Sequence, residues 1–100
     1  MKITENRVND TIVLAIEGRI DTNSSTQLQA MILQSFQKGK NLELDFERTE
    51  YITSAGLRAL LIGQKTAASK GGSMKLLKVN PMIMNVFQMS GFAKILTIEP

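Results

Sequence analysis

The chain contains no cysteine, no histidine and no tryptophan among its 100 residues. Without cysteine there is no disulfide framework and no thiolate metal site. Without histidine, the commonest metal ligand and the commonest general base are both missing. No apolar run approaches the roughly 20 residues of a membrane span, and the first residues lack the apolar core of a signal peptide. We therefore expect a cytoplasmic protein with no metal, no cofactor and no direct contact with a membrane.

Aromatic residues and net charge are also low. Five aromatics are present, and the basic residues are scattered, for a net charge of +3. Proteins that bind nucleic acid usually gather basic residues on one face and add aromatics that stack on bases. No paired carboxylates with a base, and no nucleophile with a histidine, can be assembled from these residues. Nucleic-acid binding and enzymatic activity are therefore not expected.

Hydrophobic residues make up 43% of the chain and charged residues 21%, as in an ordinary globular protein. The length predicts one domain, residues 1–100. Strand patterns lie at residues 3–7, 11–17, 41–46, 73–79 and 93–98, and helical patterns at 24–37, 54–70 and 81–90. A strand that returns through a helix pairs in parallel. The order β-β-α-β-α-β-α-β therefore predicts an α/β fold with a mixed sheet of about five strands and three to four helices.

Two predictions concern which faces are buried. Residues 11–17 are almost continuously apolar, which is typical of a strand covered on both faces. In the helix at 54–70, the helical period gives a predicted buried stripe of Leu57, Leu60, Leu61 and Ala68. Small or apolar residues fall on the opposite face, open to a partner protein: Ala59, Ile62 and Gly63.

The junction before the helix at 54–70 carries the main candidate site. Thr53 and Ser54 stand where the helical pattern begins, followed by Ala55 and Gly56. The first N–H groups of a helix lack partners and carry the positive end of its dipole. A hydroxyl there caps these donors, its commoner role, or carries a phosphate that they favour. Gly56 is explained either by close approach of another molecule or by packing of the helix on the sheet.

Residues 51–58, YITSAGLR, resemble the signature of STAS domains, in particular the bacterial anti-sigma factor antagonists. The resemblance covers nearly the whole chain and includes GRID at 18–21, the strand at 42–46 and FQMSGF at 87–92. In that family, a serine at the start of the second helix is phosphorylated by an anti-sigma factor that is also a serine kinase. Carried over by position, this serine is Ser54, and the family places the loop at Asp21 nearby.

The resemblance implies a STAS fold and a regulatory module that is a kinase substrate and not an enzyme. The unmodified chain would bind an anti-sigma factor serine kinase and so free a sigma factor. Phosphorylation of Ser54 would release it, and a serine phosphatase would be a further partner. The candidate partner-binding residues are Asp21, Thr53, Ser54, Ala55, Gly56, Arg58 and Ile62.

Alternatives stay open at several of these positions. Asp21 is equally explained as a turn or cap residue, and Arg58 as a solvated side chain. Kinase-regulated members of the family often have Asp where this chain has Thr53. This difference favours a second hypothesis, in which the chain is a STAS scaffold or accessory subunit of a transporter or other assembly. Ser54 would then be a contact residue that is never phosphorylated.

Overall fold

The computed structural model describes residues 1–100 and consists of a mixed sheet with helices packed against it. The strands are β1 (Lys2–Val8), β2 (Thr11–Ile20), β3 (Asn41–Asp45), β4 (Thr49–Ile52), β5 (Ser73–Leu77) and β6 (Thr97–Ile98). The helices are α1 (Thr22–Lys38), α2 (Ser54–Ser69), α3 (Pro81–Ser90) and the short 3₁₀-helix η1 (Phe92–Lys94). The predicted α/β class and the order of strands and helices are confirmed, with β4 as an added strand.

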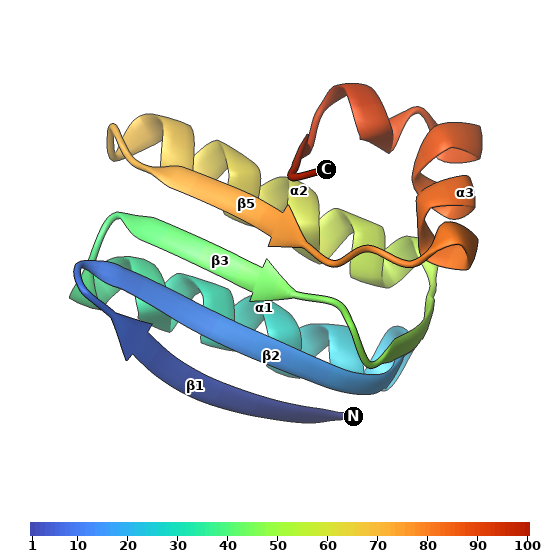
Figure 1. Ribbon diagram of the computed structural model, residues 1–100, viewed down its shortest axis with the longest axis horizontal. Coiled ribbons are helices and arrows are strands. Elements are labelled where there is room, and N and C mark those ends of the chain that lie inside the picture. The colour runs from blue at the N-terminus through green and yellow to red at the C-terminus, as the bar shows by residue number, and fades with distance from the viewer.

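The sheet has the order β1-β2-β3-β5-β6, and β4 pairs with the last residues of β2 outside this row. β1 and β2 form an antiparallel hairpin, and every other pair is parallel. The parallel pairs follow from the helical crossovers, because each helix brings the chain back to the end of the sheet at which the preceding strand began. Figure 1 shows α1 and α2 side by side behind the sheet, with α3 set apart at the end where β5 finishes.

One face of the sheet is covered and the other is open. On β2, Ile12 and Leu14 are buried in the core, whereas Val13 and Ala15 are only half-buried. The prediction that residues 11–17 are covered on both faces is therefore wrong. β-branched residues are favoured on any pleated strand, so an apolar run does not by itself distinguish an open face from a covered one.

The buried face of α2 differs from the predicted stripe. Leu57 and Leu60 are buried as predicted, but Leu61 is half-buried and Ala68 is exposed. The predicted outward position of Ala59 is wrong, because this residue is 1% exposed. The helix is rotated about its axis relative to the prediction, and small residues face the core.

Gly63, also expected on the outer face, shows why the rotation occurs. A Cβ atom at this position would lie 2.7 Å from Met74 Sδ on β5 and 2.9 Å from Ile32 Cγ2 on α1. The absence of a side chain at Gly63 therefore lets α2 approach the sheet and α1 closely. Small residues at a helix contact give no hydrophobic signal in the sequence, and the period of the larger residues misplaces the face.

Two segments differ from the predicted elements. The predicted strand at 93–98 is mostly η1 and a turn, and β6 keeps only Thr97–Ile98. Gly91 adopts φ 82° after α3, and the chain then continues into η1. β4 lies between the strand predicted at 41–46 and the helix predicted at 54–70, where no strand is expected from the sequence. Its four residues are too few for a clear alternating pattern.

The close packing at Gly56 of α2 gives a first prediction. A Cβ atom here would lie 2.6 Å from Ile52 Cγ1 and 2.7 Å from Ile20 Cγ2, both buried branched side chains. We expect Gly56→Ala to lower the free energy of unfolding by about 1–3 kcal/mol, the usual cost of overpacking. The matched control is Gly39→Ala, whose Cβ would meet only Ile12 Cδ1, at 3.7 Å. Urea denaturation measures both, and equal stabilities would contradict the packing role.

Candidate functional site

The candidate site lies at the edge of the sheet where parallel strands end. β2 and β4 pair with Ile20 opposite Ile52, and the Thr53 N–H donates to the Ile20 carbonyl at 2.9 Å. α1 and α2 begin directly after these two strands, so Asp21 and Ser54 lie at the same edge. Figure 1 shows both helices starting at the same end of the molecule. The expected proximity of the Asp21 loop to the start of α2 is confirmed.

Thr53 and Ser54 have different roles at the start of α2. Thr53 is the N-cap, and its Oγ1 accepts a hydrogen bond from the Gly56 N–H at 3.4 Å. Ser54 is the first helical residue, its side chain is exposed, and its hydroxyl makes no hydrogen bond within the chain. The capping role therefore belongs to Thr53, and the hydroxyl of Ser54 is free for chemistry or for contact with a partner.

Asp21 is the N-cap of α1. Its carboxylate accepts a hydrogen bond from the Ser24 N–H at 2.8 Å, and its own N–H donates to Ser24 Oγ at 2.8 Å. These contacts form a capping box. The Ser24 backbone N–H, followed by the Ser24 hydroxyl, lowers the pKa of Asp21 because both donate to the charged carboxylate. The capping interpretation of Asp21 is confirmed, and its side chain is also exposed at the site.

The remaining predicted residues lie at different depths. Ala55 and Ile62 are half-buried, and Arg58 is exposed. Ser54, Arg58 and Ile62 are spaced four residues apart, so they follow one face of α2. Gly56 is buried beneath this face. Of the two explanations for this glycine, its burial against Ile20 and Ile52 favours packing of the helix on the sheet, and its contact with a partner stays a prediction.

A further pair of side chains, absent from the predicted site, lies at this edge. The Arg19 guanidinium lies 4.8 Å from the centre of the Tyr51 ring, and the two residues are register partners across β2 and β4. Tyr51 is 37% exposed, so part of an aromatic side chain is accessible near the start of α2. Only the pairing of β4 with β2 brings these distant residues together, and no sequence pattern indicates it.

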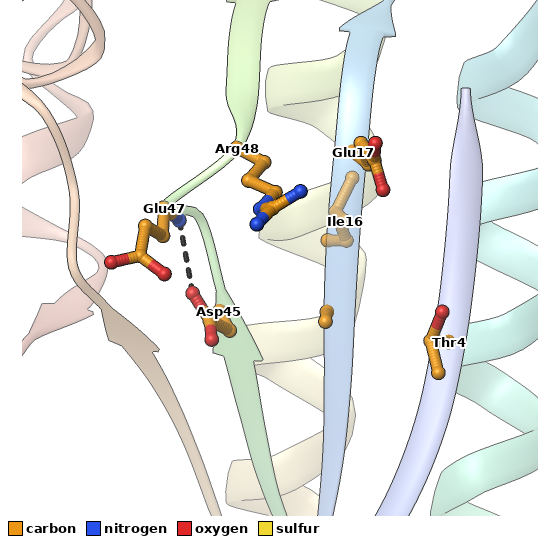
Figure 2. A pocket seen from close by; sticks show the side chains of 7 residues that line it. Thr4, Ile16, Glu17, Asp45, Glu47 and Arg48 are labelled. Carbon is orange, nitrogen blue, oxygen red and sulfur yellow. Dashed lines mark hydrogen bonds between the residues drawn. The ribbon is translucent and has the colours of Figure 1, made fainter.

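A shallow pocket lies apart from these residues, between β1, β2 and the loop after β3. It is lined by Thr4, Ala15, Ile16, Glu17, Asp45, Glu47 and Arg48. Figure 2 shows Arg48 reaching from the loop toward β2, and Asp45 Oδ1 accepting a hydrogen bond from the Glu47 N–H at 2.9 Å. None of the predicted site residues lines this pocket. No cluster of acidic side chains in the chain is arranged to hold a metal ion.

The sequence and fold define a known family. A family model described as "Mlab, STAS domain" matches residues 3–97, and the chain belongs to the STAS domain family. It is 30% identical to BtrV of Bordetella bronchiseptica, which is assigned as an anti-sigma factor antagonist. The match spans 99 residues, 98% of this chain and 85% of BtrV. No helix is long and apolar enough to cross a membrane.

Solved structures share the fold. A Thermotoga maritima protein assigned as an anti-sigma factor antagonist has a TM-score of 0.88 at 19% identity, over 96% of this chain and 84% of that protein. The anti-sigma factor antagonist SpoIIAA has a TM-score of 0.77 at 22% identity in its unphosphorylated form, over 99% of this chain and 88% of SpoIIAA. The phosphorylated form of Bacillus SpoIIAA gives 0.76 at 24% identity, over 99% and 92%.

The division of roles at the start of α2 yields a second prediction. Thr53→Ala removes the side-chain acceptor of the Gly56 N–H, so it should destabilise the protein by about 1 kcal/mol. Ser54→Ala removes no hydrogen bond within the chain and should change stability by less than about 0.5 kcal/mol. Thermal unfolding of the two variants checks this, with Thr53→Asp as the control that keeps a cap. A larger loss for Ser54→Ala than for Thr53→Ala would reverse the assignment.

The lowered pKa of Asp21 gives a third prediction, on pH dependence. A carboxyl group whose pKa is lowered by folding stabilises the protein above its ordinary pKa of 3.8, and this stabilisation is lost as pH falls through the lowered value. Asp21→Asn keeps a capping oxygen but carries no charge. We expect the wild type to lose its stability advantage over this variant as the solution is acidified below pH 3.8. Unfolding midpoints measured from neutral to acidic pH test it; a gap that stays constant would contradict it.

Proposed function

We propose that this chain is a cytoplasmic anti-sigma factor antagonist that is switched by phosphorylation of Ser54. The unmodified protein binds an anti-sigma factor through the surface formed by Asp21, Thr53, Ser54 and the outer face of α2. This binding frees the sigma factor. The observation that carries the proposal concerns Ser54, the first residue of α2. Its side chain is exposed, and its hydroxyl makes no hydrogen bond within the chain. The likeness to BtrV and to SpoIIAA, solved in both phosphorylation states, supports it.

The start of α2 favours a phosphate on Ser54. The kinase transfers the γ-phosphoryl group of ATP to Ser54 Oγ; ADP leaves with the electrons of the broken bond, and the hydroxyl proton passes to a base on the kinase. The product carries about −1.5 to −2 charges at neutral pH. The first turn of α2 has no acidic residue, so its N–H groups and dipole meet this charge without repulsion from within that turn.

The phosphate acts on the partner more than on the fold. The anti-sigma factor surface that covers the neutral hydroxyl of unmodified Ser54 would have to displace water from a doubly charged phosphate in the modified protein. This desolvation costs several kcal/mol unless new hydrogen-bond or ion-pair partners are supplied. A change of 1–3 kcal/mol in binding corresponds to roughly 5- to 150-fold in affinity. A change of this size is typical of regulatory switches, and the antagonist stays folded.

The fourth prediction tests this switch. Incubated with ATP and the anti-sigma factor kinase encoded in its own genome, the chain should acquire one phosphate, located at Ser54 by mass spectrometry. Ser54→Ala should abolish the modification and keep binding to the anti-sigma factor. Ser54→Asp should weaken binding by roughly 5- to 150-fold in calorimetric titration.

Two controls sharpen this test. Ser69 lies at the other end of α2 and is exposed. The Ser69→Ala variant should therefore still be phosphorylated at Ser54, and Ser69→Asp should bind the anti-sigma factor as tightly as the unaltered protein. Ser54→Asp should also raise the free energy of unfolding by about 0.3–1 kcal/mol, because it places a negative charge at a helix start. Phosphate at another residue, or unchanged binding by Ser54→Asp, would refute the proposal and leave the scaffold hypothesis.

A further inference from the structure

The charges on α2 are of one sign. The helix contains Arg58 and Lys65 but no acidic residue, and neither side chain takes part in an ion pair within the chain. Arg58 is exposed and lies one helical turn after Ser54. Residues four apart on a helix have Cβ atoms about 5–6 Å from each other. An arginine without an ion-pair partner therefore lies one helical turn from the free hydroxyl of Ser54.

The direction of helical side chains brings the two groups closer. Every Cα–Cβ bond in an α-helix tilts toward the N-terminus, so a long side chain covers the turn that precedes its own Cα atom. By this geometry, the Arg58 side chain is able to reach the turn that begins with Ser54. Its planar guanidinium can donate two parallel hydrogen bonds to phosphoryl oxygens, a geometry that a lysine ammonium lacks.

We infer that phosphorylation of Ser54 recruits Arg58 as an internal partner of the phosphate and withdraws this cation from the binding surface. The inference rests on the proposed function. In the unmodified protein, Arg58 is free to pair with a carboxylate of the partner. In the phosphorylated protein it is engaged within α2. Phosphorylation therefore makes two changes at once, because it adds an anion and removes a cation from the same contact.

Two other cations, Arg19 and Lys65, are less suited to the role. Arg19 already stacks on the Tyr51 ring, at 4.8 Å. Lys65 lies eleven residues after Ser54, roughly 16 Å along the helix axis at 1.5 Å per residue. The exposed carboxylates of Asp21 and Glu50, on neighbouring elements, are negative and repel a phosphate if they approach it. Arg58 is left as the cation in reach along α2.

The fifth prediction tests the pairing without any kinase. Phosphoserine is incorporated at position 54 during translation, and the second pKa of the phosphate, ordinarily about 6, is followed by ³¹P NMR. The phosphate pKa should be higher by roughly 0.2–0.7 pH unit in the Arg58→Gln variant than in the protein that keeps Arg58, as expected for loss of an exposed ion pair. Lys65→Gln is the matched control and should leave the pKa unchanged. Equal pKa values with Arg58 and with glutamine at this position would overturn the inference.

A binding cycle tests the second half of the inference. The loss of affinity for the anti-sigma factor caused by phosphoserine at position 54 should be smaller in Arg58→Gln than in the protein that keeps Arg58, because that cation is then already missing. Identical losses in both backgrounds would refute the withdrawal of Arg58. If no kinase modifies Ser54, the proposed function fails, while the ³¹P titration still decides whether Arg58 binds the phosphate.

Discussion

The site depends on one interaction, the parallel pairing of the four-residue strand β4 with the end of β2. Ile20 lies opposite Ile52, and the hydrogen bond from the Thr53 N–H to the Ile20 carbonyl extends this pairing to the last residue before α2. Both helices therefore start at the same level. Gly56 completes the arrangement, because a residue without a side chain lets the first turn of α2 lie on these two isoleucines. A different register would separate Asp21 from Ser54.

Two adjacent residues, Thr53 and Ser54, have different roles at the start of α2. The N-cap residue has an extended backbone and turns its oxygen toward the N–H groups, whereas the first helical residue directs its side chain outward. A phosphate on Thr53 would break the cap, and a phosphate on Ser54 leaves it intact. Asp and Thr are both effective N-cap residues, so Thr53 caps α2 as an aspartate at this position would. Because Thr53 is neutral, no cap carboxylate competes with a phosphate for the positive end of the helix.

The sequence predicts the parts of this structure that large residues and strong local signals determine. Both Asp21 and Thr53 are typical capping residues, and the strand at Asn41–Asp45 alternates clearly, so the helix starts and the central sheet are predictable. The rotation of α2 is not, because Ala59 and Gly63 are buried through close packing and not through their own hydrophobicity. β4 and the contact of Arg19 with Tyr51 depend on a long-range pairing that no local pattern encodes.

The proposed phosphorylation of Ser54 would suit a reversible switch, because its effects on folding and on binding differ in size. A phosphate at the start of α2 would gain a small stabilisation from the helix, about 0.3–1 kcal/mol, so the proposed modification would not endanger a fold of ordinary stability. The same charge costs a covering partner several kcal/mol of desolvation. Since the fold would barely respond, nearly all of the free energy difference between the two proposed states would appear as a difference in binding. Phosphorylation of a hydroxyl buried in the core, or of one that served as the cap, would instead couple release of the partner to unfolding of α2, and the partner could rebind after dephosphorylation only once the helix had re-formed.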